Sequence, residues 1–488
     1  MNARPLTRLA WGMSRRLAPD WHTLGPRFLP FADAATADLP LARLLRLSLF
    51  QVSVGMALAL LVGTLNRVMI VELGVGAWLV ALMVSLPVLV APFRALVGFR
   101  SDTHRSALGW RRVPYIWIGS FLQFGGLAIM PFALLLLTGR GEPGSIWLGH
   151  AGAAAAFLLV GAGVQTTQTA GLALATDLAS EQTRPRVVAL MYVMLLVGMV
   201  GAGIAYSVAL ANFSETRLVQ VIQSAAVLTV LLNVVAAWKQ EPRDPARNRD
   251  RGADAPGFGE TWRVFIRQAG AKRFLWTVGL GTMAFNMQDI VLEPYGAEVL
   301  GLSVGATSGL TAVLAGGSLA AFAIAARLLV RGTDAMRVAA AGALLGLPAF
   351  AAVVFSAPLE SPLLFRAGTL LIGFGGGLFA VGTLCAAMGM ERREHVGLAL
   401  GAWGAVQATC AGVAIALGGA IRDVVSHVAT EGLLGEALMS ASTGYSFVWH
   451  IEIYLLFATL IALGPLVRPV GQSRRKAPSK FGLAELPG

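Results

Sequence analysis

Residues 239–259 read KQEPRDPARNRDRGADAPGFG, and this stretch divides the 488-residue chain into two apolar blocks. It is rich in charge, proline and glycine, so it cannot bury enough apolar surface to fold alone and is typical of a mobile connection. The block before it spans 46–238 and the block after it spans 274–467, which are 193 and 194 residues. Two blocks of equal size indicate an internal repeat joined by a linker at 239–273.

The composition shows that each block is solvated mainly by lipid. Hydrophobic residues make up 56% of the chain and charged residues 13%, whereas a soluble protein carries about 25% charge. A helix needs about 20 apolar residues to cross a bilayer. Such runs lie at 46–71, 77–99, 113–138, 146–174, 187–211 and 217–238, and at 274–296, 304–330, 338–357, 363–388, 397–420 and 446–467. The sequence therefore predicts an all-α polytopic membrane protein with 12 transmembrane helices in two six-helix pseudo-repeats.

The distribution of basic residues predicts the orientation. Of 38 Lys and Arg residues, 33 fall in the two terminal segments and the even-numbered connections with their helix ends. The other five are Arg67, Arg140, Arg217, Arg366 and Arg422. Because positive charge is retained in the cytoplasm, both termini are predicted to be cytoplasmic. The net charge of +12 is then a sign of membrane orientation and does not indicate a nucleic-acid partner.

Three segments outside the helices are predicted to lie in the cytoplasm: 1–45, 239–273 and 468–488, the last of which is basic. Near the N-terminus, Leu6, Leu9 and Met13 share a helical face opposite Arg4 and Arg8. The stretch ETWRVFIRQAGAKR at 260–273 has the same amphipathic pattern. Both patterns favour short helices on the membrane surface over helices that bind a partner.

Two equal six-helix halves joined by a long cytoplasmic loop describe the major facilitator architecture. The stretch GFRSDTHRSALGWRR at 98–112 resembles the cytoplasmic motif of that superfamily, although the spacing after its Asp is longer. A carboxylate there can bind Arg groups and the N-terminus of a neighbouring helix, and so close an inner gate; the alternative is a solvated basic loop. The gate candidates are Gly98, Asp102, Arg105, Arg111, Arg112 and Asp177.

Charged residues inside the predicted helices are functional candidates, because an unpaired charge in a bilayer is costly. The first helix carries Asn66, Arg67 and Glu72. The seventh helix carries Asn286, Gln288, Asp289 and Glu293, followed by Pro294. These two helices hold equivalent positions in the repeats and face each other in facilitators. We therefore expect Arg67 to pair with Asp289 or Glu293, either as a functional site or as a structural closure of the outer mouth.

Small residues inside the helices predict close contact between helices. Those of the fourth, fifth and tenth helices are expected on lipid-facing surfaces, where they would pack helices or dock single-span partner helices. They are Gly161, Gly163, Gly198, Gly201, Gly203 and Gly375.

Two segments carry a resemblance to a known family. GTLNRVMIVELGV at 63–75 and QDIVLEPYGAEVLGLSVGATSGLTA at 288–312 resemble the PucC/LhaA family, the bacteriochlorophyll-delivery branch of the major facilitators. The resemblance implies an assembly factor for light-harvesting complexes in the inner photosynthetic membrane of a bacterium. It implies antenna polypeptides, the reaction centre and pigment-synthesis or insertion machinery as partners. The long N-terminal segment and basic tail resemble the LhaA type, which implies the core antenna around the reaction centre.

A bacteriochlorophyll cargo needs one axial ligand for its magnesium and an apolar slot for its ring. His150 and His450 begin the fourth and twelfth predicted helices and are the candidate ligands. Residues of this kind at a membrane interface also serve as plain anchors, which is the alternative.

Three function classes follow from these features. The first is the assembly factor, and the second is a proton-coupled transporter of a small, largely apolar solute that uses Asp289 or Glu293. The third, an enzyme, is disfavoured because no catalytic constellation, nucleotide loop or metal-ligand spacing is present in the sequence. The two cysteines, Cys385 and Cys410, lie 25 residues apart within apolar runs and form neither a disulfide framework nor a metal motif.

Overall fold

The computed structural model describes residues 35–36, 39–89, 97, 101, 109–137, 145–180, 183–241, 270–389 and 396–467. Several predicted features lie outside these residues: the N-terminal amphipathic helix, the surface helix of the linker at 260–269 and the basic tail. The gate candidates Gly98, Asp102 and Arg105 also lie outside them.

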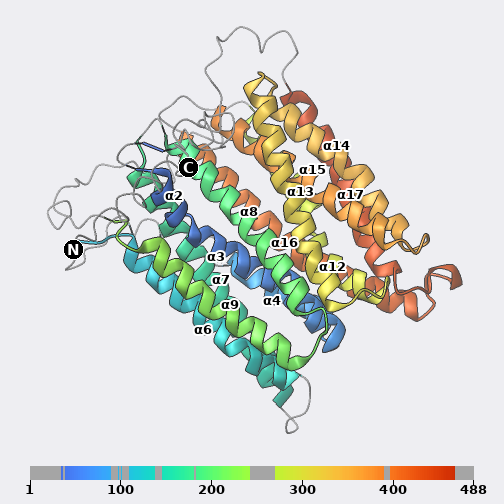
Figure 1. Ribbon diagram of the computed structural model, residues 1–488. Coiled ribbons are helices and arrows are strands. Elements are labelled where there is room, and N and C mark those ends of the chain that lie inside the picture. Colours follow the sequence, from blue (N-terminus) through green and yellow to red (C-terminus); the bar gives the residue numbers. More distant parts are fainter. Residues whose placement is uncertain are drawn as a thin grey trace, which may run out of the picture.

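The helices of the first half pack side by side into a bundle (Figure 1). The first of them starts as α-helix and continues as π-helix, labelled η2 and η3. The elements are α2 (Leu41–Leu47), α3 (Leu49–Leu58), η2 (Ala59–Leu65), η3 (Val68–Glu72), α4 (Ala77–Leu89), α6 (Val113–Leu137), α7 (Ser145–Leu178), α8 (Arg184–Ala209) and α9 (Glu215–Ala237).

The second half repeats this arrangement, and its first helix is divided in two at Met287. The elements are α11 (Ala271–Asn286), α12 (Gln288–Glu298), α13 (Val304–Val330), α14 (Ala335–Ser356), α15 (Pro362–Gly389), α16 (Val396–Thr430) and α17 (Thr443–Leu463), with short 3₁₀ turns η5 (Glu436–Leu438) and η6 (Gly464–Leu466).

The described residues form helices within every predicted apolar run, and no strand occurs among them. Within the described ranges, ten helices are long and apolar enough to cross a membrane. The all-α polytopic fold is therefore confirmed. The number of twelve crossings stays a prediction, because α4 is described over 13 residues only and the divided helix α11–α12 has two short pieces. The cytoplasmic placement of both termini also stays a prediction.

Polar caps and glycines set several helix starts. Ser214 and Ser303 precede α9 and α13, and each side chain accepts a hydrogen bond from the backbone N–H three residues later, at 3.2 and 3.3 Å. Asp334 caps α14 in the same way. These caps satisfy N–H groups that have no partner within the helix. Gly332 takes a left-handed φ of +85° in the turn before α14, which a side chain would strain.

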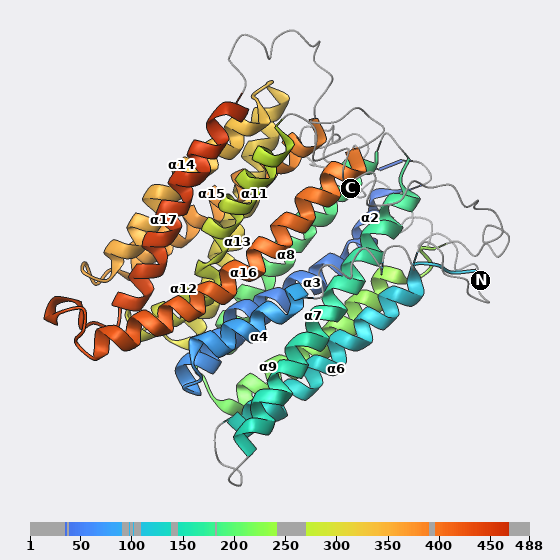
Figure 2. The ribbon, with the colours of Figure 1, turned by 180° about the vertical axis from the view of Figure 1, so that it is seen from behind.

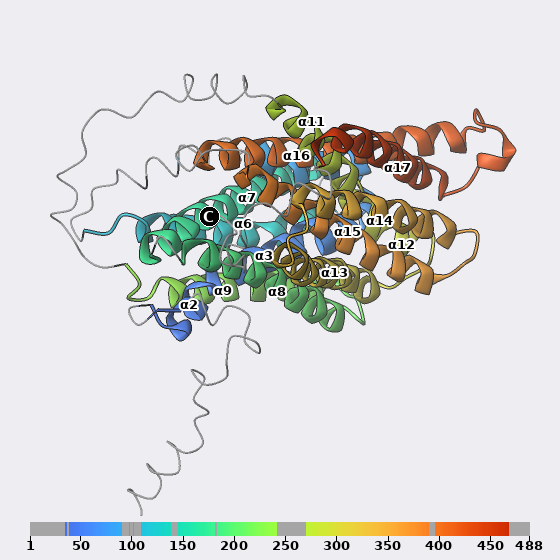
Figure 3. The ribbon, with the colours of Figure 1, turned by 90° about the horizontal axis from the view of Figure 1, so that it is seen from above.

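The two halves meet through α4 with α16 and through α8 with α13 (Figures 1 and 2). In each pair, glycine allows the close approach. A Cβ on Gly419 of α16 would lie 2.6 Å from the Ala77 carbonyl oxygen of α4. A Cβ on Gly305 of α13 would lie 2.5 Å from the Ser207 carbonyl oxygen of α8. Seen from above, the helices of the two halves lie side by side (Figure 3).

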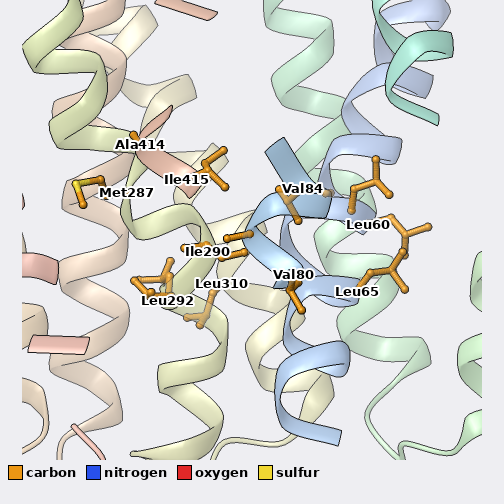
Figure 4. Packing of buried hydrophobic residues seen from close by; sticks show 14 of the residues in the cluster. Leu60, Leu65, Val80, Val84, Met287, Ile290, Leu292, Leu310, Ala414 and Ile415 are labelled. Carbon is orange, nitrogen blue, oxygen red and sulfur yellow. The ribbon is translucent and has the colours of Figure 1, made fainter. Parts of the chain in front are cut away.

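Buried apolar residues form a continuous core between the halves near the break in α11–α12 (Figure 4). Leu60 and Leu65 reach it from η2, and Val80 and Val84 from α4. The second half contributes Met287, Ile290, Leu292, Leu310, Ala414 and Ile415. This core fixes the walls of the site described next.

Candidate functional site

A cavity of about 300 Å³ lies between the two halves. Its walls come from the first helix, α4, α7 and α8 on one side and from α11, α12, α13 and α16 on the other. Most lining side chains are aliphatic. The polar ones are Gln165, Asn286, Gln288, Asp289, Glu293 and Thr311. An apolar pocket with a few convergent polar groups is the usual form of a small-ligand site.

Both first helices of the repeats are irregular beside this cavity. The first helix is π-helical over Ala59–Leu65 and Val68–Glu72, and the seventh is interrupted at Met287. π-Helical turns are rare and occur frequently at functional sites. Broken helices in equivalent positions of two repeats mark the binding sites of many transporters. The π-helical turns could not be predicted from the sequence, since their residues also suit an α-helix.

The Pro294 ring explains one contact across the halves. Proline has no backbone N–H, so it cannot donate to the carbonyl four residues earlier, at Ile290. The Asn66 Nδ2 group from the first helix donates to the Ile290 backbone carbonyl oxygen at 3.0 Å instead, and to the Asp289 backbone carbonyl oxygen at 3.3 Å. Asn66 thereby satisfies a buried acceptor that the proline leaves open.

Glu293 is buried, with 3% of its surface exposed, and lines the cavity. The Thr311 hydroxyl of α13 donates to Glu293 Oε1 at 2.6 Å, while Glu293 Oε2 has no hydrogen-bond partner. Gly63 of η2 leaves room for this pair, because a Cβ there would collide with Glu293 Oε1 and Thr311 Oγ1. Thr311 and Gly63 are site residues that sequence reasoning missed.

Arg67 does not pair with the carboxylates of the seventh helix as expected. Its guanidinium forms an ion pair with Glu72, and no ion pair joins it to Asp289 or Glu293. The reason is the π-helical geometry. In an α-helix, residues five apart point about 140° away from each other, whereas a π-helix bonds residue i to i+5 and brings them to one face.

Gln288 and Asp289 lie directly after the break, at the start of α12, and line the same cavity as Glu293. The Gln288 Nε2 group donates to Asp289 Oδ1, and Gln288 Oε1 is buried without a partner. Asn286 turns back to its own helix and donates to the Thr282 oxygen at 2.7 Å. Two acceptors beside the cavity, Gln288 Oε1 and Glu293 Oε2, are therefore buried without a hydrogen-bond partner.

Glu452 of α17 is a further buried carboxyl group that sequence reasoning missed. It is fully buried, and its Oε1 accepts a hydrogen bond from the Gln288 backbone N–H at 2.6 Å. The Gln288 N–H belongs to the first residue of α12 and has no acceptor within the helix, so the Glu452 carboxyl group supplies one. An acidic residue within the last apolar run was the available signal, under the same rule that selected Asp289.

A polar cluster joins the halves at their predicted outer ends. Arg422 of α16 forms ion pairs with Glu298 and with Asp423, the latter at 2.8 Å, and stacks 4.6 Å above the Tyr445 ring. Asp423 Oδ2 also accepts the Trp78 backbone N–H of α4 at 2.7 Å. The eleventh helix was predicted to end at 420, but α16 continues to Thr430. This extension brings Arg422 into the bundle.

The predicted inner gate is described only in part. Asp177 accepts from Arg112 Nε at 3.1 Å and lies 3.8 Å from Arg111 Nη2. Ser101 accepts from Arg112 Nη1 at 2.7 Å. The N-terminus of α6 is capped by Glu241, whose carboxylate accepts from three successive backbone N–H groups, beginning at Arg111. Glu241 was missed, because a carboxylate at the start of a linker gives no sign of which helix it caps.

The two histidine candidates lie away from the cavity. His150 stands on α7 with its ring 6.0 Å from that of Trp147, and its Nδ1 is buried without a hydrogen-bond partner. His450 is exposed on α17, and its Nδ1 lies 2.6 Å from the Ser446 oxygen. Neither lines the cavity. Among the described residues, no group of His, Cys, Asp or Glu is arranged to hold a metal ion.

The glycines expected on lipid-facing surfaces prove to be mostly internal. A Cβ on any of five of them would meet atoms of another helix of this chain within 2.8 Å. These are Gly161, Gly163, Gly198, Gly203 and Gly375. They pack helices within the chain and cannot dock a partner. Only Gly201 of the six has open space beside it. The sequence could not show this, because hydropathy does not distinguish the lipid-facing side of a helix from its protein-facing side.

The chain is a multi-pass membrane protein with the major facilitator fold. A bacterial homologue of the human lysosomal transporter Spinster, solved in an inward-facing conformation, aligns with a TM-score of 0.66 at 14% identity, over 89% of this chain and 98% of that chain. Likeness at this identity concerns the fold alone.

Sequence comparison identifies the family. The PUCC protein family model matches residues 64–470, and the chain belongs to this family. Protein PucC of Rhodovulum sulfidophilum is 60% identical over 407 residues, covering 83% of this chain and 90% of that protein. An uncharacterized protein of the puhA-bchM intergenic region in Rhodobacter capsulatus is 54% identical, covering 97% and 99%. The family resemblance read from the sequence is thereby confirmed.

Proposed function

We propose that the chain is an assembly factor for a photosynthetic light-harvesting complex, which docks antenna polypeptides in the membrane and handles bacteriochlorophyll. The match to the PucC family over 64–470, with 60% identity to a PucC protein, is the observation that carries this proposal. The role is one of binding and not of catalysis. Pigment-synthesis or insertion machinery is a further expected partner.

The core antenna and the reaction centre are the preferred partners over the peripheral antenna. The long N-terminal segment and the basic tail support this preference, since they resemble the LhaA type. The relative from the puhA-bchM region shares nearly the whole chain, including most of that segment.

The central cavity does not fit a whole pigment. Its volume of about 300 Å³ is at the lower end of pockets that hold drug-sized ligands, and bacteriochlorophyll is larger than such ligands. An exposed face of α6 offers a better contact for a flat ring, because Trp117, Phe121, Phe124 and Phe132 all point outward. His150 lies on the adjoining α7. We therefore assign pigment contact to this face.

The test is the protein gently extracted from its host. Antenna polypeptides and reaction-centre subunits should copurify, and the absorption spectrum should contain bacteriochlorophyll bands. Phe121→Ala should lower the bound pigment several-fold, since ring stacking contributes about 1 kcal/mol or more per aromatic pair. Phe355→Ala on α14 is the matched control, because both rings are 58% exposed. Extracts without pigment and antenna polypeptides would refute the proposal, and equal loss in both variants would refute the α6 face.

A proton-coupled transporter of a small, largely apolar solute is the second candidate. The observation in its favour is the cavity between the halves, with Asp289 and Glu293 in its wall. Purified protein in liposomes should then take up protons together with solute, and Glu293→Gln should abolish the coupling. Copurified antenna polypeptides without proton uptake would favour the assembly factor instead.

A further inference from the structure

A second and larger hollow lies on the outside of the first half, away from the central cavity. It is a groove of about 640 Å³ between α8 and α9, with α3 as its floor. Val52 and Met56 form the floor. The Tyr206 hydroxyl of α8 donates to the Met56 oxygen at 3.2 Å and fixes α8 against that floor. The groove is thus a built feature of the bundle.

One wall of the groove is smooth because α8 presents small residues to it. Gly198, Gly201, Ala202, Ala205 and Ala209 line this wall. A Cβ on Gly201 would meet nothing within 4 Å, so this glycine faces open space instead of another helix. Such a wall accepts a long flexible chain along its length, but small residues alone do not identify the occupant.

The opposite wall of the groove, formed by α9, indicates the chemistry of the occupant. Arg217, Gln220 and Ser224 line the groove and are exposed, and they are followed by Leu228 and the partly buried Leu232. Spacings of three and four residues place the polar groups on one helical face, over about 10 Å of helix. The wall therefore changes in order from cationic to neutral polar to apolar, from the end of the bundle toward its centre.

The polar side chains of this wall carry hydrogen-bond donors that no described residue accepts. Arg217 Nη1 donates to the Asn212 oxygen at 3.0 Å, which holds the guanidinium at the mouth of the groove and leaves its other donors open. Gln220 and Ser224 form no side-chain hydrogen bond with described residues. In a membrane, polar groups without partners are costly. A ligand with acceptors in the same order would satisfy them.

We infer that the groove binds one anionic glycerophospholipid, with the phosphate on Arg217, the ester oxygens near Gln220 and Ser224, and an acyl chain along the small-residue wall of α8. From Arg217 to Leu232 the helix rises about 22 Å. One leaflet contributes about 15 Å of hydrocarbon, so the groove holds the full length of a chain. Arginine and phosphate form charge-assisted, bidentate hydrogen bonds.

The size of the groove argues against a partner helix as its occupant. A helix with side chains is about 10–12 Å wide and about 30 Å long when it spans the bilayer, which gives a volume on the order of 2,500 Å³. The groove has about a quarter of that volume. A transmembrane helix is therefore too large to lie wholly within the groove, which leaves room for a narrower hydrocarbon chain.

The experiment is native mass spectrometry of the full chain in detergent micelles doped with phosphatidylglycerol or phosphatidylcholine. One phosphatidylglycerol should stay bound to the unaltered protein at activation energies that remove phosphatidylcholine. Arg217→Gln should lower its affinity about tenfold, as expected for the loss of a charge-assisted contact. Gly201→Leu should have a similar effect, because the added side chain fills the groove.

Matched controls separate the groove from general effects. Arg366→Gln removes another exposed arginine, on α15, and Gly316→Leu adds the same bulk at another glycine with open space. Both controls should bind phosphatidylglycerol like the unaltered protein. Equal retention of the two lipids, undiminished binding by both groove variants or equal loss in the controls would each overturn the proposal. A copurifying single-span polypeptide that crosslinks inside the groove in place of lipid would do so as well.

Discussion

The ion pair between Arg67 and Glu72 gives the sharpest test of the site geometry. The perturbation is Glu72→Gln, Arg67→Gln and the double substitution, which together form a double-mutant cycle. Two unit charges 4 Å apart attract by about 4 kcal/mol at an effective dielectric constant of 20. The Arg67 side chain is 5% exposed and that of Glu72 is 34% exposed, so water screens the pair on one side only. We therefore expect a coupling energy of about 2 kcal/mol, between the values for exposed and buried pairs.

The assay is the free energy of unfolding in detergent, measured by denaturant titration of all four proteins. Glu72→Gln should lower the free energy of unfolding more in the unaltered protein than in the Arg67→Gln variant. In the unaltered protein the substitution leaves the buried Arg67 guanidinium without its partner, whereas in the variant that charge is already absent. A parallel cycle of Arg67→Gln with Glu293→Gln is the control, and its coupling should be weaker because no ion pair joins these residues. A stronger coupling of Arg67 to Glu293 than to Glu72 would refute the π-helical pairing and restore the pair expected from the sequence.

Three further predictions follow from the described contacts. Gly63→Ala should lower the free energy of unfolding by about 1–3 kcal/mol through overpacking against Glu293. The control Gly316→Ala has open space beside it, so its denaturant midpoint should be unchanged or raised. Equal effects of the two substitutions would contradict the steric argument. Glu241→Ala should destabilise the start of α6 by about 1 kcal/mol, seen as faster hydrogen exchange of its first amides, and unchanged exchange would exclude the cap. A reporter fused after Trp238 should be cytoplasmic and one fused within 431–442 external; the opposite pattern would reverse the orientation.

Much of the architecture could be predicted because the bilayer imposes it. A run of about 20 apolar residues has few alternatives to a helix in lipid, and the charged stretch at 239–259 separates two runs of equal length. The polar residues of the first and seventh helices were also visible, since a charge inside an apolar run is rare. The cavity does contain Asp289 and Glu293 in its wall.

The sequence by itself thus determined the helices, their division into two halves and which helices carry polar groups. The tertiary structure decided the partners of those groups. Asn66 satisfies the carbonyl that Pro294 leaves open, although 228 residues separate the two in the chain. Arg67 binds Glu72 because the helix locally widens. Helix periodicity follows from local sequence, whereas a hydrogen bond between distant helices depends on how they pack. In a bilayer the lipid-facing and protein-facing sides of a helix are equally apolar, so the sequence does not show which side packs against which helix.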